Sequence, residues 1–137
     1  MKRRLALTAL IISIGLGAGI LARPRAPMQI QVDSEKLSKL KALREEPKFL
    51  DLPGAPAAEE RRRLEPLINA LLDRLILGLE SNPDDTWVIG QMDSTVEAFH
   101  LEDTEARERC IDYIEKIFGI LGIPDDRGAF LKYMIVW

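Results

Sequence analysis

The sequence predicts an all-α protein, a compact bundle of four to five helices that follows an N-terminal transmembrane or signal helix. Three observations support this fold class. An uncharged, mainly apolar run occupies residues 5–22. Further along, apolar side chains recur at spacings of three and four residues, which is the period of one helix face. Gly and Pro residues separate these segments, as the turns between helices require.

Residues 1–25 read as a signal peptide or a membrane anchor. Basic residues 2–4 precede the 18-residue apolar run 5–22, which as a helix would span roughly 27 Å, near the minimum for crossing a bilayer. More positive charge precedes the run than follows it at Arg23 and Arg25, which favours export of the remainder. We expect membrane contact through residues 5–22 and a cell-envelope location on the periplasmic or extracellular side, either membrane-anchored or secreted. Whether the leader is cleaved is left open.

Charge and cysteine content limit the partners. Without residues 1–22 the chain holds 16 basic and 22 acidic residues, a net charge of −6. Nucleic acid is therefore a poor partner. Residues 80–137 contain 13 acidic and five basic side chains, so we expect a basic protein partner for this half, the alternative being a solvated acidic face. The single cysteine excludes an internal disulfide.

Residues 26–57 are expected to form a tether with one short helix. The alternation of apolar and polar residues over 26–32 indicates an extended tether or a short edge strand. Asp33 or Ser34 can cap a helix that reaches about residue 46, where a proline follows.

Residues 58–137 are expected to form the helical core domain. The apolar periodicity predicts helices over residues 58–81, 84–100 and 103–122. Gly122 and the proline two residues later are typical of a left-handed helix end. The last nine residues, 129–137, favour a helix through their i, i+4, i+7 spacing of large apolar side chains, but their strand propensity leaves a strand open.

The strongest metal-binding pattern is Glu97 with His100, because Glu-x-x-His places a carboxylate and an imidazole on one helix face. His100 is the only histidine in the chain, so a di-iron site of the carboxylate-bundle type is excluded. A mononuclear site with Asp93, Glu97 and His100 is the remaining metal hypothesis, set against a solvent-facing polar edge. No catalytic residue and no cofactor are expected, and Cys110 is expected to be a buried small hydrophobe.

An acidic stripe on the 103–122 helix is the candidate interaction face. Its members are Glu105, Glu108, Asp112 and Glu115. The alternative is a solvated face with i, i+4 ion pairs to Arg109 and Lys116. Two further acidic pairs, at residues 84–85 and 125–126, directly precede helices and are expected to cap them.

The same helix carries two short patterns, Arg107-Glu108-Arg109-Cys110 and Ile120-Leu121-Gly122-Ile123. Together they resemble the C-terminal signature of a family of small bacterial helical domains of unknown function. The resemblance covers roughly residues 80–130. An acidic pair, Glu102-Asp103 here, precedes the arginines. In the family this pair joins the arginines more directly, whereas residues 104–106 intervene here. The resemblance implies a compact helical domain and transfers no functional residue.

These observations favour a non-enzymatic protein-interaction module of the cell envelope, similar in role to an inhibitor or immunity protein. Three features motivate this hypothesis: the small size of the protein, the uneven distribution of its charge, and the lack of a recognisable group of catalytic residues in the sequence. The alternative is a small-ligand-binding or hydrolytic envelope domain with a pocket lined by Trp87, Met92 and Phe99. A third reading is an accessory subunit packed on other membrane proteins. The partner and the oligomeric state are not predicted.

Overall fold

The computed structural model describes residues 23–50 and 57–134, and this part of the chain is helical. Its five helices are α1 (Ser34–Glu45), α2 (Ala58–Gly78), α3 (Asp85–His100), α4 (Thr104–Leu121) and α5 (Leu131–Met134). The described residues contain no strand, and their one β-bridge joins Gln29 to Asp84. The prediction of a compact helical bundle is confirmed, whereas the predicted leader helix lies outside the described residues.

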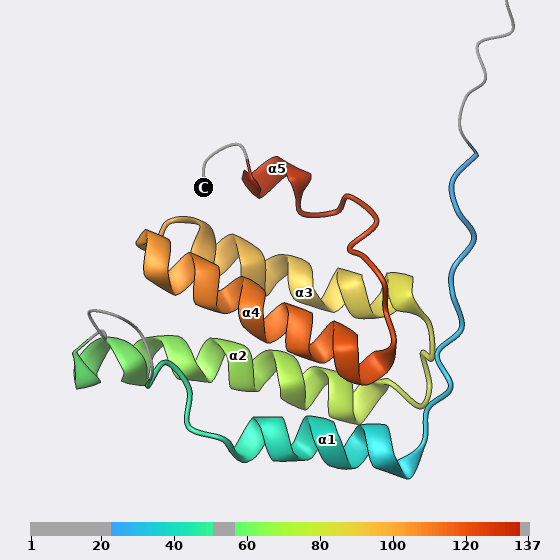
Figure 1. Cartoon of the computed structure of the whole chain (residues 1–137), viewed down its shortest axis with the longest axis horizontal. Coiled ribbons are helices and arrows are strands. Elements are labelled where there is room, and N and C mark those ends of the chain that lie inside the picture. Colours follow the sequence, from blue (N-terminus) through green and yellow to red (C-terminus); the bar gives the residue numbers. More distant parts are fainter. Residues whose placement is uncertain (1–22, 51–56, 135–137) are drawn as a thin grey trace, which may run out of the picture.

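The four long helices run alternately up and down (Figure 1). α2 contacts α1 and α3, and α4 closes the bundle by contacting both α1 and α3. The short α5 lies against α3. Within residues 23–50 and 57–134, no helix is both long enough and apolar enough to cross a bilayer.

Aspartates begin three of the helices, as the sequence predicts. The carboxylates of Asp33, Asp84 and Asp103 accept hydrogen bonds from backbone amides three residues ahead, at 2.8–2.9 Å. Each therefore satisfies one of the amides that a helix start leaves without a partner. Gly122 ends α4 with φ 73°, a left-handed conformation in which any other residue would be strained.

α2 ends three residues earlier than the predicted boundary at residue 81. The side-chain amide of Asn82 donates to the Gly78 carbonyl at 3.0 Å, and the Asn82 backbone amide donates to the same carbonyl at 3.1 Å. Asn82 thereby caps the helix end, which explains why the chain turns here toward α3. The helix is continuous across Pro66.

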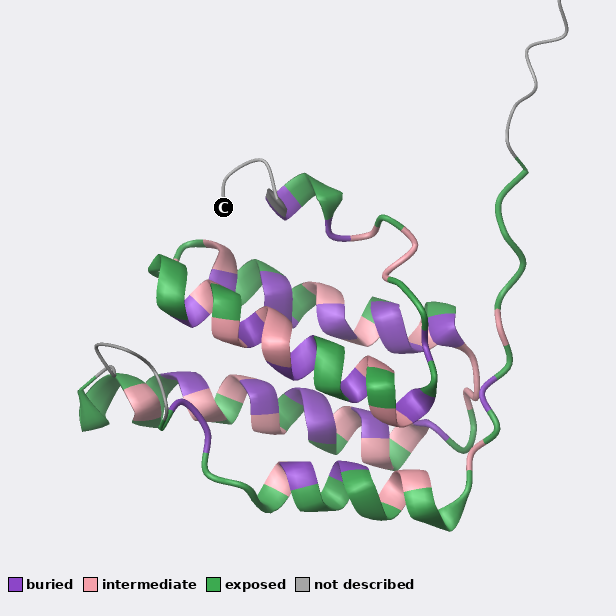
Figure 2. Cartoon of the chain, in the orientation of Figure 1, coloured by how far each residue is buried: buried purple, intermediate pink, exposed green. Residues whose placement is uncertain are grey.

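The core is one cluster of buried apolar side chains drawn from all the helices (Figure 2). α1 belongs to it, since Leu40 is fully buried and Leu43 is 5% exposed. The helix expected within the 26–57 tether is therefore packed as part of the bundle, where α1 contacts α2 and α4. Cys110 is also fully buried, as predicted.

An aromatic cluster closes the core beside the α1–α2 connection. Phe49 is fully buried, stacks on Phe99 with ring centroids 5.9 Å apart, and meets the Tyr113 ring edge-on at 5.4 Å. Its backbone has φ 62°, a left-handed conformation that costs a non-glycine residue about 1–3 kcal/mol. The Phe49 amide donates to the Tyr113 hydroxyl at 3.0 Å, so packing and a hydrogen bond together hold the strained residue in place.

Gly78 allows Trp87 of α3 to pack directly against the end of α2. A Cβ atom built at this position would lie 2.5 Å from Cη2 and 2.6 Å from Cζ2 of Trp87. No real Cβ approaches a ring this closely, so the indole lies where only glycine leaves room for it.

Gly78→Ala is expected to destabilise the fold by about 1–3 kcal/mol, because the indole must move to admit the methyl group. The measurement is urea unfolding followed by tryptophan fluorescence. Gly90→Ala is the matched control: Gly90 is also helical, and a Cβ atom added there would have no neighbour within 4 Å. This change should stabilise the protein by up to about 1 kcal/mol through helix propensity. Equal effects of the two substitutions would contradict the proposed contact.

Candidate interaction site

The acidic stripe predicted from the sequence lies on α4. Glu105, Glu108 and Glu115 are exposed, and Asp112 is partly buried. Arg109 pairs with Asp112 at 3.0 Å, an i, i+3 ion pair. The three glutamates are the carboxylates of the stripe that lie exposed on the surface of α4.

An apolar groove of about 410 Å³ runs along one edge of this stripe, and we call it the α4 groove. Its lining residues come from α4 and from the turn that follows; they are Ile111, Ile114, Glu115, Phe118, Pro124, Asp125, Asp126 and Phe130. Glu108 lies seven residues before Glu115 and so occurs on the same side of the helix. The α4 groove therefore has an apolar floor, with Glu115 of the stripe on its rim and Glu108 two turns away on the same side of α4.

Asp126 shapes the far wall of the α4 groove. Its two carboxylate oxygens accept the backbone amides of Gly128 and Phe130, each at 2.9 Å. Asp125 accepts the Arg127 amide at 2.8 Å. These acidic residues thus bind backbone amides as expected, but they build a tight turn and not the start of a long helix.

A second polar cluster, not foreseen from the sequence, surrounds Asp85. This side chain is fully buried, and Arg127 donates to its two oxygens at 2.7 Å and 3.0 Å. The Met28 amide donates to the same carboxylate at 2.8 Å. Burial alone would raise the pKa of Asp85, but these hydrogen bonds and the charge of Arg127 outweigh burial and hold the pKa below its usual value.

Arg127 also fixes residues 25–30, which we call the strap. Its guanidinium donates to the backbone carbonyls of Arg25 at 2.6 Å and Ala26 at 2.7 Å. The Arg25 side chain in turn makes two hydrogen bonds to Asp125, at 2.8 Å and 3.0 Å. The strap therefore meets the start of α3 and the turn after α4 at the same end of the bundle.

The metal hypothesis finds no support in the arrangement of its three residues. The Asp93 carboxylate meets Lys132 at 2.9 Å and the Tyr133 hydroxyl at 3.3 Å, and the His100 ring packs against Tyr133 with centroids 5.4 Å apart. α5 thus covers this face of α3. Within residues 23–50 and 57–134, no three His, Cys, Asp or Glu side chains are grouped closely enough to hold a metal ion.

The pocket postulated around Trp87, Met92 and Phe99 is occupied by the core itself. Met92 and Phe99 are fully buried, and Trp87 packs onto Gly78. Three hollows on the described surface are lined by other residues. Met92 and Phe99 therefore contribute to the core and do not line any of these three hollows.

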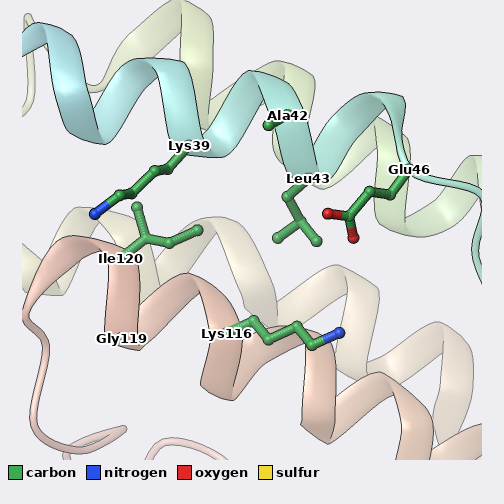
Figure 3. Close-up of a pocket in the computed structure, with 7 residues that line it drawn as sticks. All are labelled: Lys39, Ala42, Leu43, Glu46, Lys116, Gly119 and Ile120. Atoms are coloured by element: carbon green, nitrogen blue, oxygen red, sulfur yellow. The ribbon is translucent and has the colours of Figure 1, made fainter.

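A hollow of about 470 Å³ lies between α1 and α4 (Figure 3). Lys39 of α1 and Glu46, the residue after α1, border it on one side, and Lys116 borders it from α4. Its charges have both signs and it is widely open to solvent, so it has no preference for a charged ligand. A shallow hollow also lies at the strap, beside Thr86 and Arg127.

Cys110 is expected to be inert in the native protein. Desolvation by burial raises the pKa of its thiol to about 12, so the reactive thiolate is scarce at neutral pH. A thiol reagent such as Ellman's reagent should react with native protein at least about a hundredfold more slowly than with protein unfolded in guanidinium. Comparable rates in both conditions would contradict the buried position.

One family model matches residues 31–135, and its description is "Domain of unknown function (DUF4844)". The match spans all five helices and begins just after the strap. No curated protein and no solved structure matches the chain.

Proposed function

Because the chain belongs to the DUF4844 family of domains of unknown function, we propose a role from its surface: it is a non-enzymatic module that binds a basic protein segment. The site is the α4 groove together with the acidic stripe. The observation that carries the proposal is the apolar floor of the groove, which lies directly beside the exposed carboxylate of Glu115. An inhibitor or immunity protein would use such a face to cover a basic partner.

The groove favours one kind of occupant. Its apolar lining can bury one or two large apolar side chains, and burial of such side chains supplies most of the binding free energy at an interface. Carboxylates at the rim attract lysine and arginine and repel acidic segments. The expected partner segment therefore combines an aromatic or leucine side chain with neighbouring basic residues.

We place this binding in the cell envelope, with the domain held at the membrane by residues 5–22. The support is the length of this apolar run and the excess of basic residues before it. Flotation of the full-length protein with cell membranes, before and after a carbonate wash, tests the anchor separately from the groove.

Binding is tested with a fluorescent amphipathic peptide made of Lys, Leu and one Trp, measured by anisotropy. The double substitution Glu108→Gln/Glu115→Gln is expected to weaken binding about fivefold, since each exposed charge pair contributes a few tenths to 1 kcal/mol. Ile111→Ser should weaken it further by removing apolar surface from the groove. Raising the salt from about 0.05 M to about 0.5 M should weaken wild-type binding.

The matched control is Glu59→Gln/Glu60→Gln, which removes two exposed carboxylates from the start of α2. It changes the net charge by the same amount and leaves the groove intact. If both double substitutions weaken binding equally, the peptide senses only net charge and the site on α4 is refuted. A natural partner captured from cell extract supports the proposal only if Ile111→Ser abolishes capture and the control does not.

A further inference from the structure

The strap lies between the apolar run of the sequence and the bundle, and hydrogen bonds hold it to the bundle. Its backbone is paired with the α3 entry: the Ile30 amide donates to the Pro83 carbonyl at 2.7 Å, and the Asp85 amide donates to the Met28 carbonyl at 3.0 Å. Two side-chain interactions add to this pairing. Arg127 donates to the backbone carbonyls of Arg25 and Ala26, and the Arg25 side chain forms an ion pair with Asp125. The strap is thus held from its first residue to its last.

The distance from the strap to the apolar run is short. Only Arg23 and Pro24 separate the end of the run at residue 22 from Arg25, whose carbonyl Arg127 holds. Even fully extended, these residues span no more than about 10 Å. An anchor in the bilayer would therefore keep the first bonded residue of the strap close to the lipid headgroups.

We infer that the strap holds the bundle in one orientation at the membrane, with the end formed by the strap, the start of α3 and residues 125–128 facing the lipid surface. This inference rests on the anchor in the proposed function and adds to it the face that meets the membrane. The opposite end of the bundle points away from the bilayer. It contains the start of α2 and the end of α3, and Figure 1 shows both far from the strap.

The orientation also restricts the partner. Asp125 pairs with Arg25 of the strap and lines the α4 groove, so the groove opens beside the membrane-facing end. A partner that fills the groove must then reach it close to the headgroups. The basic segment expected there belongs to a protein that is itself in the membrane or directly at its surface.

The test reconstitutes full-length protein into phosphatidylcholine–phosphatidylglycerol vesicles that carry a nitroxide quencher on the headgroups of both leaflets. A fluorophore is attached through Thr86→Cys at the strap end or through Glu59→Cys at the far end; both positions are exposed. The buried native Cys110 gives little background labelling. α2 has 21 residues and so separates these positions by about 30 Å.

Quenching at position 86 is expected to exceed quenching at position 59 several-fold. A long Gly-Ser linker inserted between residues 22 and 23 leaves every strap contact intact and should abolish most of this difference. Equal quenching at the two positions without the linker refutes the fixed orientation. A difference that survives the linker refutes the strap as its cause, because the bundle would then bind lipid by itself. Chains that fail to float with the vesicles refute the anchor, and this inference with it, while leaving the peptide-binding test of the α4 groove unaffected.

Discussion

Asp85→Asn is expected to destabilise the folded protein by about 3–5 kcal/mol, the cost of leaving one member of a buried ion pair without its partner. The Arg127 side chain is only 15% exposed and Asp85 is fully buried, so water is a poor substitute for the lost carboxylate. The substitution preserves size but removes the charge, and it replaces one of the two acceptor oxygens with an NH2 group that cannot accept from Arg127 or Met28. Urea unfolding, followed by circular dichroism, measures the change.

Two comparisons make this prediction specific. Asp73→Asn removes the carboxylate of an exposed pair with Arg44, in which the Arg44 and Asp73 side chains are 34% and 50% exposed, and should cost less than about 1 kcal/mol. The double substitution Asp85→Asn/Arg127→Ala should cost less than the sum of its single substitutions, because it leaves no unpaired buried charge. Additive losses would show that the two side chains do not act as a pair.

The Asp85 carboxylate also determines how the stability of the protein is expected to depend on pH. Its pKa is lowered in the folded state, so its contribution to stability is present above the unfolded-state pKa of about 3.9 and is lost as the pH falls through the folded-state value. Wild-type stability should therefore fall more steeply below about pH 4 than that of Asp85→Asn. Parallel pH profiles would contradict a buried, ionised Asp85.

Local patterns in the sequence were sufficient to predict most of the helices. The caps at Asp33 and Asp103 and the helix end at Gly122 depend on neighbours within four residues, so spacing reveals them. The buried position of Cys110 follows in the same way from its place on the apolar face of its helix. Each of these features depends only on residues of a single helix and its immediate ends.

The features that the sequence did not reveal depend on contacts between distant segments. Asp85 was expected to be a simple helix cap, but its partner Arg127 is 42 residues away, and only the fold brings the two together. The α4 groove was missed for the same reason, because half of its lining lies in the turn after the helix. Of this surface, the sequence predicted only the acidic stripe, because its members recur at helical spacing along one helix.

Loop residues were the hardest to predict, because no period marks them. Lys48 is 1% exposed, and its ammonium donates to the Arg44 and Glu46 carbonyls at 3.1 Å and 2.7 Å. It thereby caps the end of α1, while burial lowers its pKa. Nothing in its sequence neighbourhood distinguishes it from an exposed lysine, and the same holds for the burial of Phe49 next to it.

Phe49→Ala is expected to destabilise the protein by about 3–5 kcal/mol. Removal of the ring creates a cavity beside Phe99 and Tyr113 that the helices cannot fill by small shifts. Phe49 is fully buried, so almost all of its apolar surface contributes. The measurement is urea unfolding, with near-ultraviolet circular dichroism as a report on packing of the aromatic cluster. Should this variant fail to fold, Phe49→Leu, which retains part of the volume, should still lose about 1–2 kcal/mol.

Two further variants separate packing from the hydrogen bond. Tyr113→Phe keeps the ring but removes the hydroxyl that accepts the Phe49 amide, and it should cost about 1–3 kcal/mol because that buried amide loses its partner. Leu50→Ala changes the adjacent loop residue, which is 55% exposed, and should alter stability by less than about 0.5 kcal/mol. A loss at Leu50 comparable to the loss at Phe49 would mean that the whole loop, and not the inserted ring, stabilises the bundle. A negligible loss in Tyr113→Phe would instead leave ring packing alone to hold Phe49 in its left-handed conformation.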